Sequence, residues 1–396
     1  MKIAVDYQDQ TLELEVAEDR LVGRWSGPQS EATADLRGLA LAQFASPVDF
    51  PPLSRAVVPG DRVVIPLNPA TPALLAVLGA LAETLHTAEV ASITVVSTAP
   101  EPPGIPEGVA WLVHDPDDKP QIAYLASTQE EQRIYLNRQI TDADLVLPLG
   151  EIGYDGTLGY RGPWSALYPA LSERATLNRF RGLHAGGVAD PENPTASFAE
   201  STEVSKLLGC QFHVGVLAGH GGVARVIAGL ESAVRPEAIR AVDDAWTFRV
   251  EDRADVVIVG IGEAGRPATI EDLAAGLATA SRLVRRGGKI VALSQVAGDP
   301  GPSVRRIRGA ENPRSALNRL RGREADPDYQ AARSLAEAAA QADVYLHSAL
   351  DPDLVDDLGF IAVDRPEEAR KLAASAPTCL LISHADRTRA LVVGEP

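Results

Sequence analysis

The feature that most constrains the fold is a strand, a helix and a second strand that follow one another closely near the N-terminus. Residues 62–66 and 91–97 are β-branched runs, and residues 72–85 between them are rich in Ala and Leu. Two strands joined in this way can pair in parallel, because a parallel pair needs a crossover of a dozen or more residues, usually a helix. The pattern therefore predicts a parallel α/β unit.

A second alternation of the same kind begins near residue 253. The run 255–259 is typical of a buried strand, Thr269 with Asp272 predicts a capped helix, and residues 289–293 predict the next strand. At 396 residues the chain is too long for one ordinary core. We expect an α/β protein of two domains, residues 1–249 and a Rossmann-like 250–396. Each would have a mainly parallel sheet flanked by helices, with a cleft between them and the last residues packing back on the first domain.

Composition limits the classes of partner. The 54 acidic residues exceed the 37 basic ones, and the resulting charge of −17 opposes binding to nucleic acid or to a membrane surface, which are both anionic. Cys210 and Cys379 form neither a disulfide framework nor a metal knuckle, as expected for a reduced cytoplasm. No run of 18 apolar residues could span a bilayer. We expect a cytoplasmic protein whose partner is a small molecule; the sequence does not indicate its oligomeric state.

The candidate ligand site is the stretch 142–177, which runs from a buried-strand pattern into glycines, aromatics and charges. Loops beyond strand ends are where α/β proteins bind ligands. A guanidinium fork suits a carboxylate or phosphate, so the arginines here are candidate anion contacts. Tyr154, Tyr160, Trp164 and Tyr168 would add aromatic walls for a planar ligand. The alternative is that the arginines pair with the many acids and that these aromatics fill a domain interface. The predicted ligand-binding residues are Arg161, Gly162, Trp164, Ser165, Arg174 and Arg181.

This stretch resembles the central motif of the nickel-pincer lactate racemases. The shared features are Gly159-Tyr160, Gly162 and the segment 169–174, with His114-Asp-Pro-Asp-Asp118, Tyr135-Leu-Asn-Arg138 and the run 52–65 upstream. The resemblance implies a two-domain α/β fold and chemistry on a 2-hydroxy acid. In that family a nickel-bound pincer nucleotide is tethered to a lysine, a histidine helps to hold the metal, and two more histidines move the hydroxyl proton.

The sequence departs from the family at the positions that would carry this chemistry. Asp155 stands where a proton-shuttling histidine is expected, and Ser165 stands where the tethering lysine is expected. The nickel histidine would fall near Arg181, and His184 is close by. We therefore expect a catalytically diverged relative that binds a small anion in the cleft, with no cofactor and no metal. One alternative is an active racemase or epimerase with a noncovalent nickel-pincer nucleotide, Asp155 as base and His184 as metal ligand; another is a non-catalytic partner or regulatory subunit.

Three other features have less specific interpretations. Gly260, Gly262 and Gly265 match G-x-G-x-x-G after a strand, but Pro267 delays the helix and no acid ends the next strand, which favours a tight turn over a nucleotide site. The spacing of His213 and His220 fits no standard metal site and favours structural roles. The arginines of residues 305–323 are interspersed with acids, as on a solvated or interdomain face.

Overall fold

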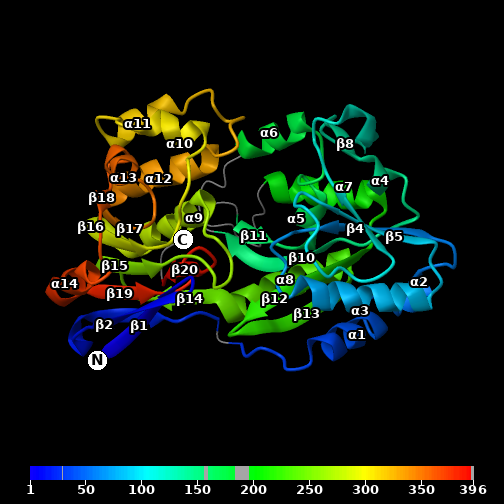
Figure 1. The fold of residues 1–396 in the computed structure, drawn as a ribbon, viewed down its shortest axis with the longest axis horizontal. Coiled ribbons are helices and arrows are strands. Elements are labelled where there is room, and N and C mark those ends of the chain that lie inside the picture. The colour runs from blue at the N-terminus through cyan, green and yellow to red at the C-terminus, as the bar shows by residue number, and fades with distance from the viewer. Residues whose placement is uncertain (29, 156–158, 183–195, 394–396) are drawn as a thin grey trace.

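The structure is a computed structural model that describes residues 1–28, 30–155, 159–182 and 196–393. It contains two large, mainly parallel sheets, each flanked by helices, which lie on opposite sides of the molecule (Figure 1). The predicted α/β class is confirmed.

The first sheet has the order β13-β12-β10-β4-β5-β6, with β9 beside β4 and β11 beside β10. Its pairs are parallel except β12 with β13 and β10 with β11. The strands are β4 (Arg62–Leu67), β5 (Ser92–Ser97), β6 (Val109–Val113), β9 (Leu145–Val146), β10 (Leu149–Asp155), β11 (Gly159–Arg161), β12 (Phe212–Gly219) and β13 (Gly222–Leu230).

The second sheet has the order β18-β17-β16-β15-β19-β3, and all of its pairs are parallel. The strands are β3 (Leu21–Trp25), β15 (Ala254–Gly260), β16 (Val284–Leu293), β17 (Asp343–His347), β18 (Ile361–Ala362) and β19 (Cys379–Ile382). Residues 21–25 were predicted to lie in the N-terminal domain, yet they form the edge strand of this C-terminal sheet. The domain boundary near residue 250 itself stays a prediction.

Three two-stranded sheets complete the β structure of the described chain. The hairpin of β1 (Lys2–Tyr7) and β2 (Gln10–Glu15) packs its apolar face against the second sheet, where Val5 and Leu14 meet Ile258 in one core cluster. The other two are β7 (Ile122–Ser127) with β8 (Arg133–Asn137), and β14 (Thr247–Val250) with β20 (Arg389–Val392).

The α-helices cover the sheets and the junction between them (Figure 1). Those of the N-terminal half are α1 (Leu36–Ala45), α2 (Leu53–Ala56), α3 (Leu74–Thr87), α4 (Arg138–Thr141), α5 (Pro163–Leu167), α6 (Arg174–Gly182), α7 (Ala196–Leu208) and α8 (Glu231–Trp246). Those of the C-terminal half are α9 (Ile270–Leu283), α10 (Pro302–Ile307), α11 (Pro313–Arg319), α12 (Tyr329–Gln341), α13 (Pro352–Asp357) and α14 (Glu368–Ser375). Two short 3-10 helices, η1 (Glu18–Arg20) and η2 (Lys119–Gln121), lie in connections.

Each large sheet has a point at which its strand order reverses. In the first sheet the chain proceeds from β4 to β5 and β6 on one side, whereas β10 and β12 lie on the other. In the second sheet β15 leads to β16, β17 and β18 on one side, and β19 lies on the other. Open α/β sheets bind ligands in the crevice outside the carboxyl ends of the strands at such a point. A ligand site is therefore expected at the carboxyl ends of β10 and β4, or at those of β15 and β19.

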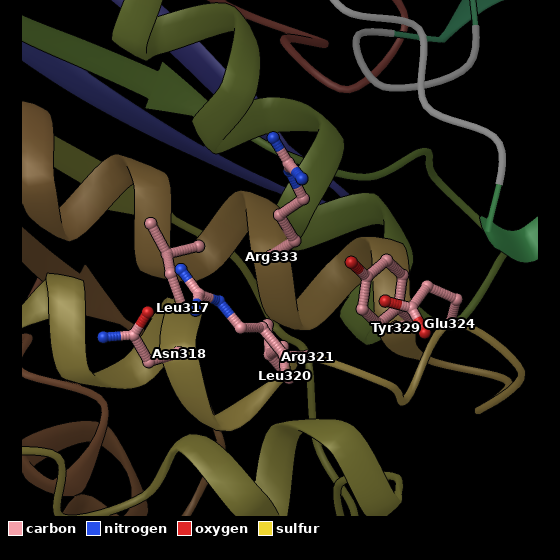
Figure 2. Close-up of a pocket in the computed structure, with 7 residues that line it drawn as sticks. All are labelled: Leu317, Asn318, Leu320, Arg321, Glu324, Tyr329 and Arg333. Carbon is pink, nitrogen blue, oxygen red and sulfur yellow. The ribbon is translucent and has the colours of Figure 1, made fainter.

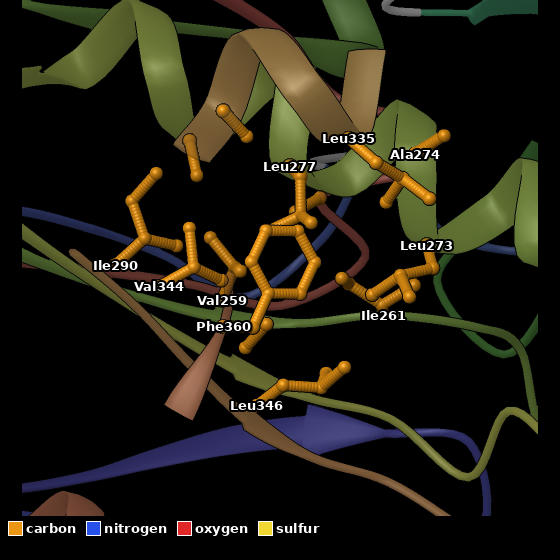
Figure 3. Close-up of a cluster of buried hydrophobic side chains, with 14 of the residues drawn as sticks. Val259, Ile261, Leu273, Ala274, Leu277, Ile290, Leu335, Val344, Leu346 and Phe360 are labelled. Carbon is orange, nitrogen blue, oxygen red and sulfur yellow. The ribbon is translucent and has the colours of Figure 1, made fainter. Parts of the chain in front are cut away.

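The largest core joins the second sheet to the helices α9 and α12 (Figure 3). Leu277 of α9 and Leu335 of α12 face the strand residues Val259 and Ile290, and Phe360 closes the cluster. All five side chains are at most 3% exposed. Burial of these apolar side chains fixes the two helices on the sheet.

The substitution Leu277→Ala is expected to lower the free energy of unfolding by about 2–5 kcal/mol, because it removes buried methyl groups and leaves a cavity. Urea denaturation checks this. The matched control is Leu75→Ala, at a leucine that is 39% exposed, which should change the free energy of unfolding far less. Equal losses in the two variants would contradict this account of the core.

Candidate ligand site between the two sheets

An ion-pair triad connects the reversal points of the two sheets. Glu151 lies two residues beyond Leu149, where β10 pairs with the last residue of β4. Arg387 follows the end of β19, and Glu263 lies in the turn after β15. The Arg387 Nη2 atom is 3.1 Å from Glu151 Oε1 and 2.9 Å from Glu263 Oε2. The first half of the chain is thus joined to the second at the edge where α/β sheets bind ligands.

Two members of the triad are shielded from solvent, since Glu151 is 2% exposed and Arg387 is 7% exposed. The Glu263 side chain is 39% exposed. Burial alone would lower the pKa of Arg387, but the charges of Glu151 and Glu263 outweigh it and raise that pKa. Arg387 is therefore held as a cation, and one oxygen of each carboxylate is engaged with it.

Arg161 lies next to this triad on the strand β11. It pairs with Gly153 of β10 in antiparallel register, and its Nη2 atom is 3.7 Å from Glu151 Oε2. That separation is longer than a hydrogen bond. Arg161 Nε and Glu151 Oε2 are both buried, and neither has a hydrogen-bond partner among the described residues. Arg161 and Glu151 therefore form an ion pair, while Arg161 Nε and Glu151 Oε2 keep hydrogen-bonding capacity at the junction.

The loop that follows Arg161 is packed inward. A Cβ atom on Gly162 would lie 2.3 Å from the Trp164 ring, so the indole occupies the space that any larger residue would need. Trp164 is 2% exposed, and the Arg235 guanidinium stacks over it at 4.4 Å. The half-buried Ser165 lies in the short helix α5, and its amide donates a hydrogen bond to the carbonyl oxygen of Gly162 at the helix start, at 2.9 Å. Trp164 is thus an interior residue, and its predicted role as a ligand wall has no support in this geometry.

The other predicted ligand arginines lie elsewhere. Arg174 is at the surface, where its Nη2 atom is 2.8 Å from Asp117 Oδ2, so it pairs with an acid as the alternative interpretation had it. For Arg181 the structure describes only the backbone, in α6, and for Asp155 only the backbone, in β10. His184 lies outside the described residues. Arg161 is therefore the predicted arginine that the described chain brings to the junction.

The tyrosines of the loop also bind groups within the protein. Arg282 of α9 donates to the Tyr154 hydroxyl oxygen at 2.9 Å, and the Tyr160 hydroxyl donates to Asp243 at 2.7 Å. Arg389 of β20 donates to the same Asp243 oxygen at 2.9 Å. Burial and the bond to Asp243 raise the pKa of Tyr160. These contacts tie the β10–β11 hairpin to the C-terminal half, and the contact of Arg389 with Asp243 brings β20 against α8.

The glycine-rich turn after β15 has the geometry of a turn whose amides are already used. Gly262 N donates to Asp386 Oδ1 and Gly265 N donates to Asp9 Oδ1, both at 3.0 Å. The N-terminus of α9 is closed by the capping box of Thr269 and Asp272. A nucleotide phosphate would meet carboxylates where it needs donors. The arrangement agrees with the tight turn favoured by the sequence.

A cavity of about 220 Å³ between α11 and α12 lies apart from the triad (Figure 2). Its lining includes Arg321, Glu324, Tyr329 and Arg333, and none of the junction residues. Elsewhere in the arginine-rich segment, Arg308 pairs with Asp357. The segment is thus largely a solvated face.

Glu151, Arg387 and Glu263 are site residues that the sequence analysis missed. The sequence contains one indication of this ion pair. Glu151 lies inside the apolar strand pattern of residues 145–152, and a buried glutamate is rarely found without a partner of opposite charge. Arg387 and Glu263 carried no comparable signal, since each stands in a loop rich in charge.

Comparison with known proteins is consistent with this architecture. Residues 104–193 match the model of the lactate racemase N-terminal domain family. The lactate racemase apoprotein of Thermoanaerobacterium thermosaccharolyticum superposes with a TM-score of 0.79 and 16% identity, over 99% of this chain and 100% of that one. Residues 104–193 are thus similar to the lactate racemase N-terminal domain, and the whole chain has the fold of that apoprotein. A Thermotoga maritima protein solved by a structural genomics consortium has a TM-score of 0.67 and 12% identity, over 90% of this chain and 98% of that one. No curated protein sequence matched.

By resemblance, the family's tethering lysine falls at position 165, where this chain has a serine. Within the described ranges, no group of three or more His, Cys, Asp or Glu side chains could hold a metal ion.

In the same part of the chain, no helix is long and apolar enough to cross a membrane.

His213 is a buried histidine on β12 beneath the Trp164 loop. It is fully buried, which agrees with the structural role favoured by the sequence. Neither ring nitrogen has a hydrogen-bond partner among the described residues, whereas most buried polar groups have one. Burial, together with the nearby Arg235 charge, lowers the pKa of His213 to about 3. The folded protein therefore keeps this ring neutral at pH values where the unfolded chain protonates it.

We expect His213 to make the protein less stable in mild acid. The pKa of His213 is lower in the folded state than in the unfolded chain. The free energy of unfolding is therefore fully retained above about pH 6.5 and decreases as the pH falls towards 3. The loss should be about 2 kcal/mol at pH 5. Urea unfolding at pH 7 and pH 5 should show His213→Leu losing less stability on acidification than the unmodified protein. The control is His220→Leu at an exposed position, and an unchanged pH dependence in His213→Leu would contradict the assignment.

Proposed function

We propose that this protein belongs to the lactate racemase family and binds a small 2-hydroxy-acid anion at the junction of its two sheets, with Arg161 as the carboxylate contact. The observation that carries the proposal is the state of the Arg161 fork. Its Nε atom is buried without a partner among the described residues, and its Nη2 atom is 3.7 Å from the nearest carboxylate oxygen. The edge formed by these two nitrogens has the geometry that binds a carboxylate in bidentate fashion.

The position of Arg161 supports the same proposal. It stands on β11, beside the reversal point of the first sheet and against residues that follow β15 and β19 in the second. A ligand there would touch both halves of the protein, as ligands in the interdomain crevices of α/β proteins do. The lactate racemase fold supplies the substrate class, a 2-hydroxy acid, by resemblance.

The substitution Arg161→Gln is expected to weaken binding of lactate at least tenfold, because it removes the charged fork and leaves a neutral amide. Isothermal titration calorimetry measures this directly. The matched control is Arg174→Gln, which removes an arginine that was also predicted to bind the ligand but is paired with Asp117 at the surface. Equal affinity in the unmodified protein and Arg161→Gln, or an equal loss in Arg174→Gln, would contradict the proposal.

We further propose that the protein carries no covalently attached pincer nucleotide, since position 165 is a serine. After co-expression with the enzymes of pincer synthesis and with nickel supplied, denaturing mass spectrometry should give the mass of the unmodified chain, 41.9 kDa. A covalent adduct would contradict this proposal. A native spectrum with nickel and a noncovalent pincer would instead favour an active racemase or epimerase.

A further inference from the structure

We propose that Glu151 is the residue that makes the site selective for 2-hydroxy acids, by accepting a hydrogen bond from the ligand's hydroxyl group. This inference rests on the proposed function and deepens it. It assigns a role to a side chain that is unlike the histidines of the lactate racemase family, and it follows from the geometry around β10.

The two oxygens of Glu151 have different surroundings. Oε1 is 3.1 Å from Arg387 Nη2, whereas Oε2 has no hydrogen-bond partner among the described residues. A buried carboxylate oxygen without a donor is costly, and such groups in native proteins call for an explanation. A hydroxyl group brought by a ligand would provide the missing donor.

The residue beside Glu151 on the same face of β10 has no side chain. Gly153 lies two residues along β10 on the same face, and a Cβ atom there would be 3.7 Å from Arg161 Nη2 and 3.8 Å from Glu151 Oε1. A guanidinium and a carboxylate thus flank a position without a side chain. A 2-hydroxy acid carries its carboxylate and its hydroxyl on adjacent carbons, so it can address Arg161 and Glu151 together.

Arg387 gives this arrangement its electrostatic balance. A lone glutamate beside Arg161 would repel a ligand carboxylate. Because Arg387 pairs with Glu151 and is itself held by Glu263, much of the negative charge of Glu151 is already offset. Arg161, which is 3.7 Å from Glu151 Oε2, therefore shares that carboxylate with Arg387, and a ligand carboxylate could take its place beside Arg161.

The site is covered in this structure. Glu151 Oε2 and Arg161 Nε are shielded from solvent, and Arg387 and Glu263 from the C-terminal half lie over Glu151. The ligand would therefore reach Glu151 when the two halves move apart, and it would be enclosed when they return. In the enclosed site, a ligand that gives Glu151 Oε2 no hydrogen-bond donor loses more binding free energy than it would in water.

The experiment compares racemic lactate with propionate, which has the same carbon skeleton without the hydroxyl group. Calorimetric titration of the unmodified protein should show at least tenfold tighter binding of lactate. In Glu151→Leu the ratio of the two affinities should fall to about one, because the ligand hydroxyl group then has no acceptor at this position. Glu151→Gln keeps an acceptor oxygen and should retain part of the preference, and it serves as the second variant if the leucine variant does not fold.

The outcomes separate the two proposals. If the unmodified protein binds both acids equally, or if Glu151→Leu keeps the full preference for lactate, the role of Glu151 is overturned while carboxylate binding at Arg161 stands. If neither acid binds the unmodified protein, the proposed function fails and the role of Glu151 fails with it. Loss of both affinities together in Glu151→Gln, with the protein still folded, would mean that Glu151 only supports the structure.

Discussion

The ion pairs of Arg387 are the constraint on which the junction depends. One guanidinium from the end of the chain lies between a glutamate of the first sheet and a glutamate that follows a strand of the second. Taking such charges out of water is expensive, and the cost is offset only when opposite charges meet in good geometry. Removal of one partner would leave an uncompensated buried charge, which typically costs about 3–5 kcal/mol. The relative placement of the two sheets, and with it the surroundings of Arg161, follows from this contact.

Much of the fold could be predicted because its signals are local. The β-branched run 255–259 lies within β15, and the capping box of Thr269 and Asp272 is present as expected. The exception is β3, whose membership of the second sheet depends on pairing with β19, more than 350 residues away along the chain. No local pattern contains that information.

The candidate site could be predicted only in part, for a related reason. An arginine or a tyrosine in a glycine-rich loop has the same sequence signature whether it meets a ligand or a protein group. The sequence predicts Arg174 as a ligand contact because no neighbouring residue indicates its actual partner. That partner, Asp117, is 57 residues away along the chain. Tyr154 and Tyr160 are likewise engaged with residues of distant segments. Glu151 was missed because its partners follow β15 and β19, so that only the fold brings them together.

The features that resemble the lactate racemases include residues that hold one another in place. His114 bonds through Nε2 to the Ser172 carbonyl oxygen at 2.9 Å, and its Nδ1 atom is 3.2 Å from the Asn137 side-chain amide. These residues are buried, and all lie within the segment that matches the family model. At these positions the features shared with the lactate racemases support the loop.

The position of β3 also affects how the protein can be divided. Because residues 21–25 complete the C-terminal sheet and β20 lies beside β14, the backbone passes between the two halves more than once. A single cut near residue 250 would leave β19 with an unpaired edge and the hairpin β1–β2 without the surface it covers. The two halves are thus interdependent in assembly, and each is completed by chain that is contiguous with the other.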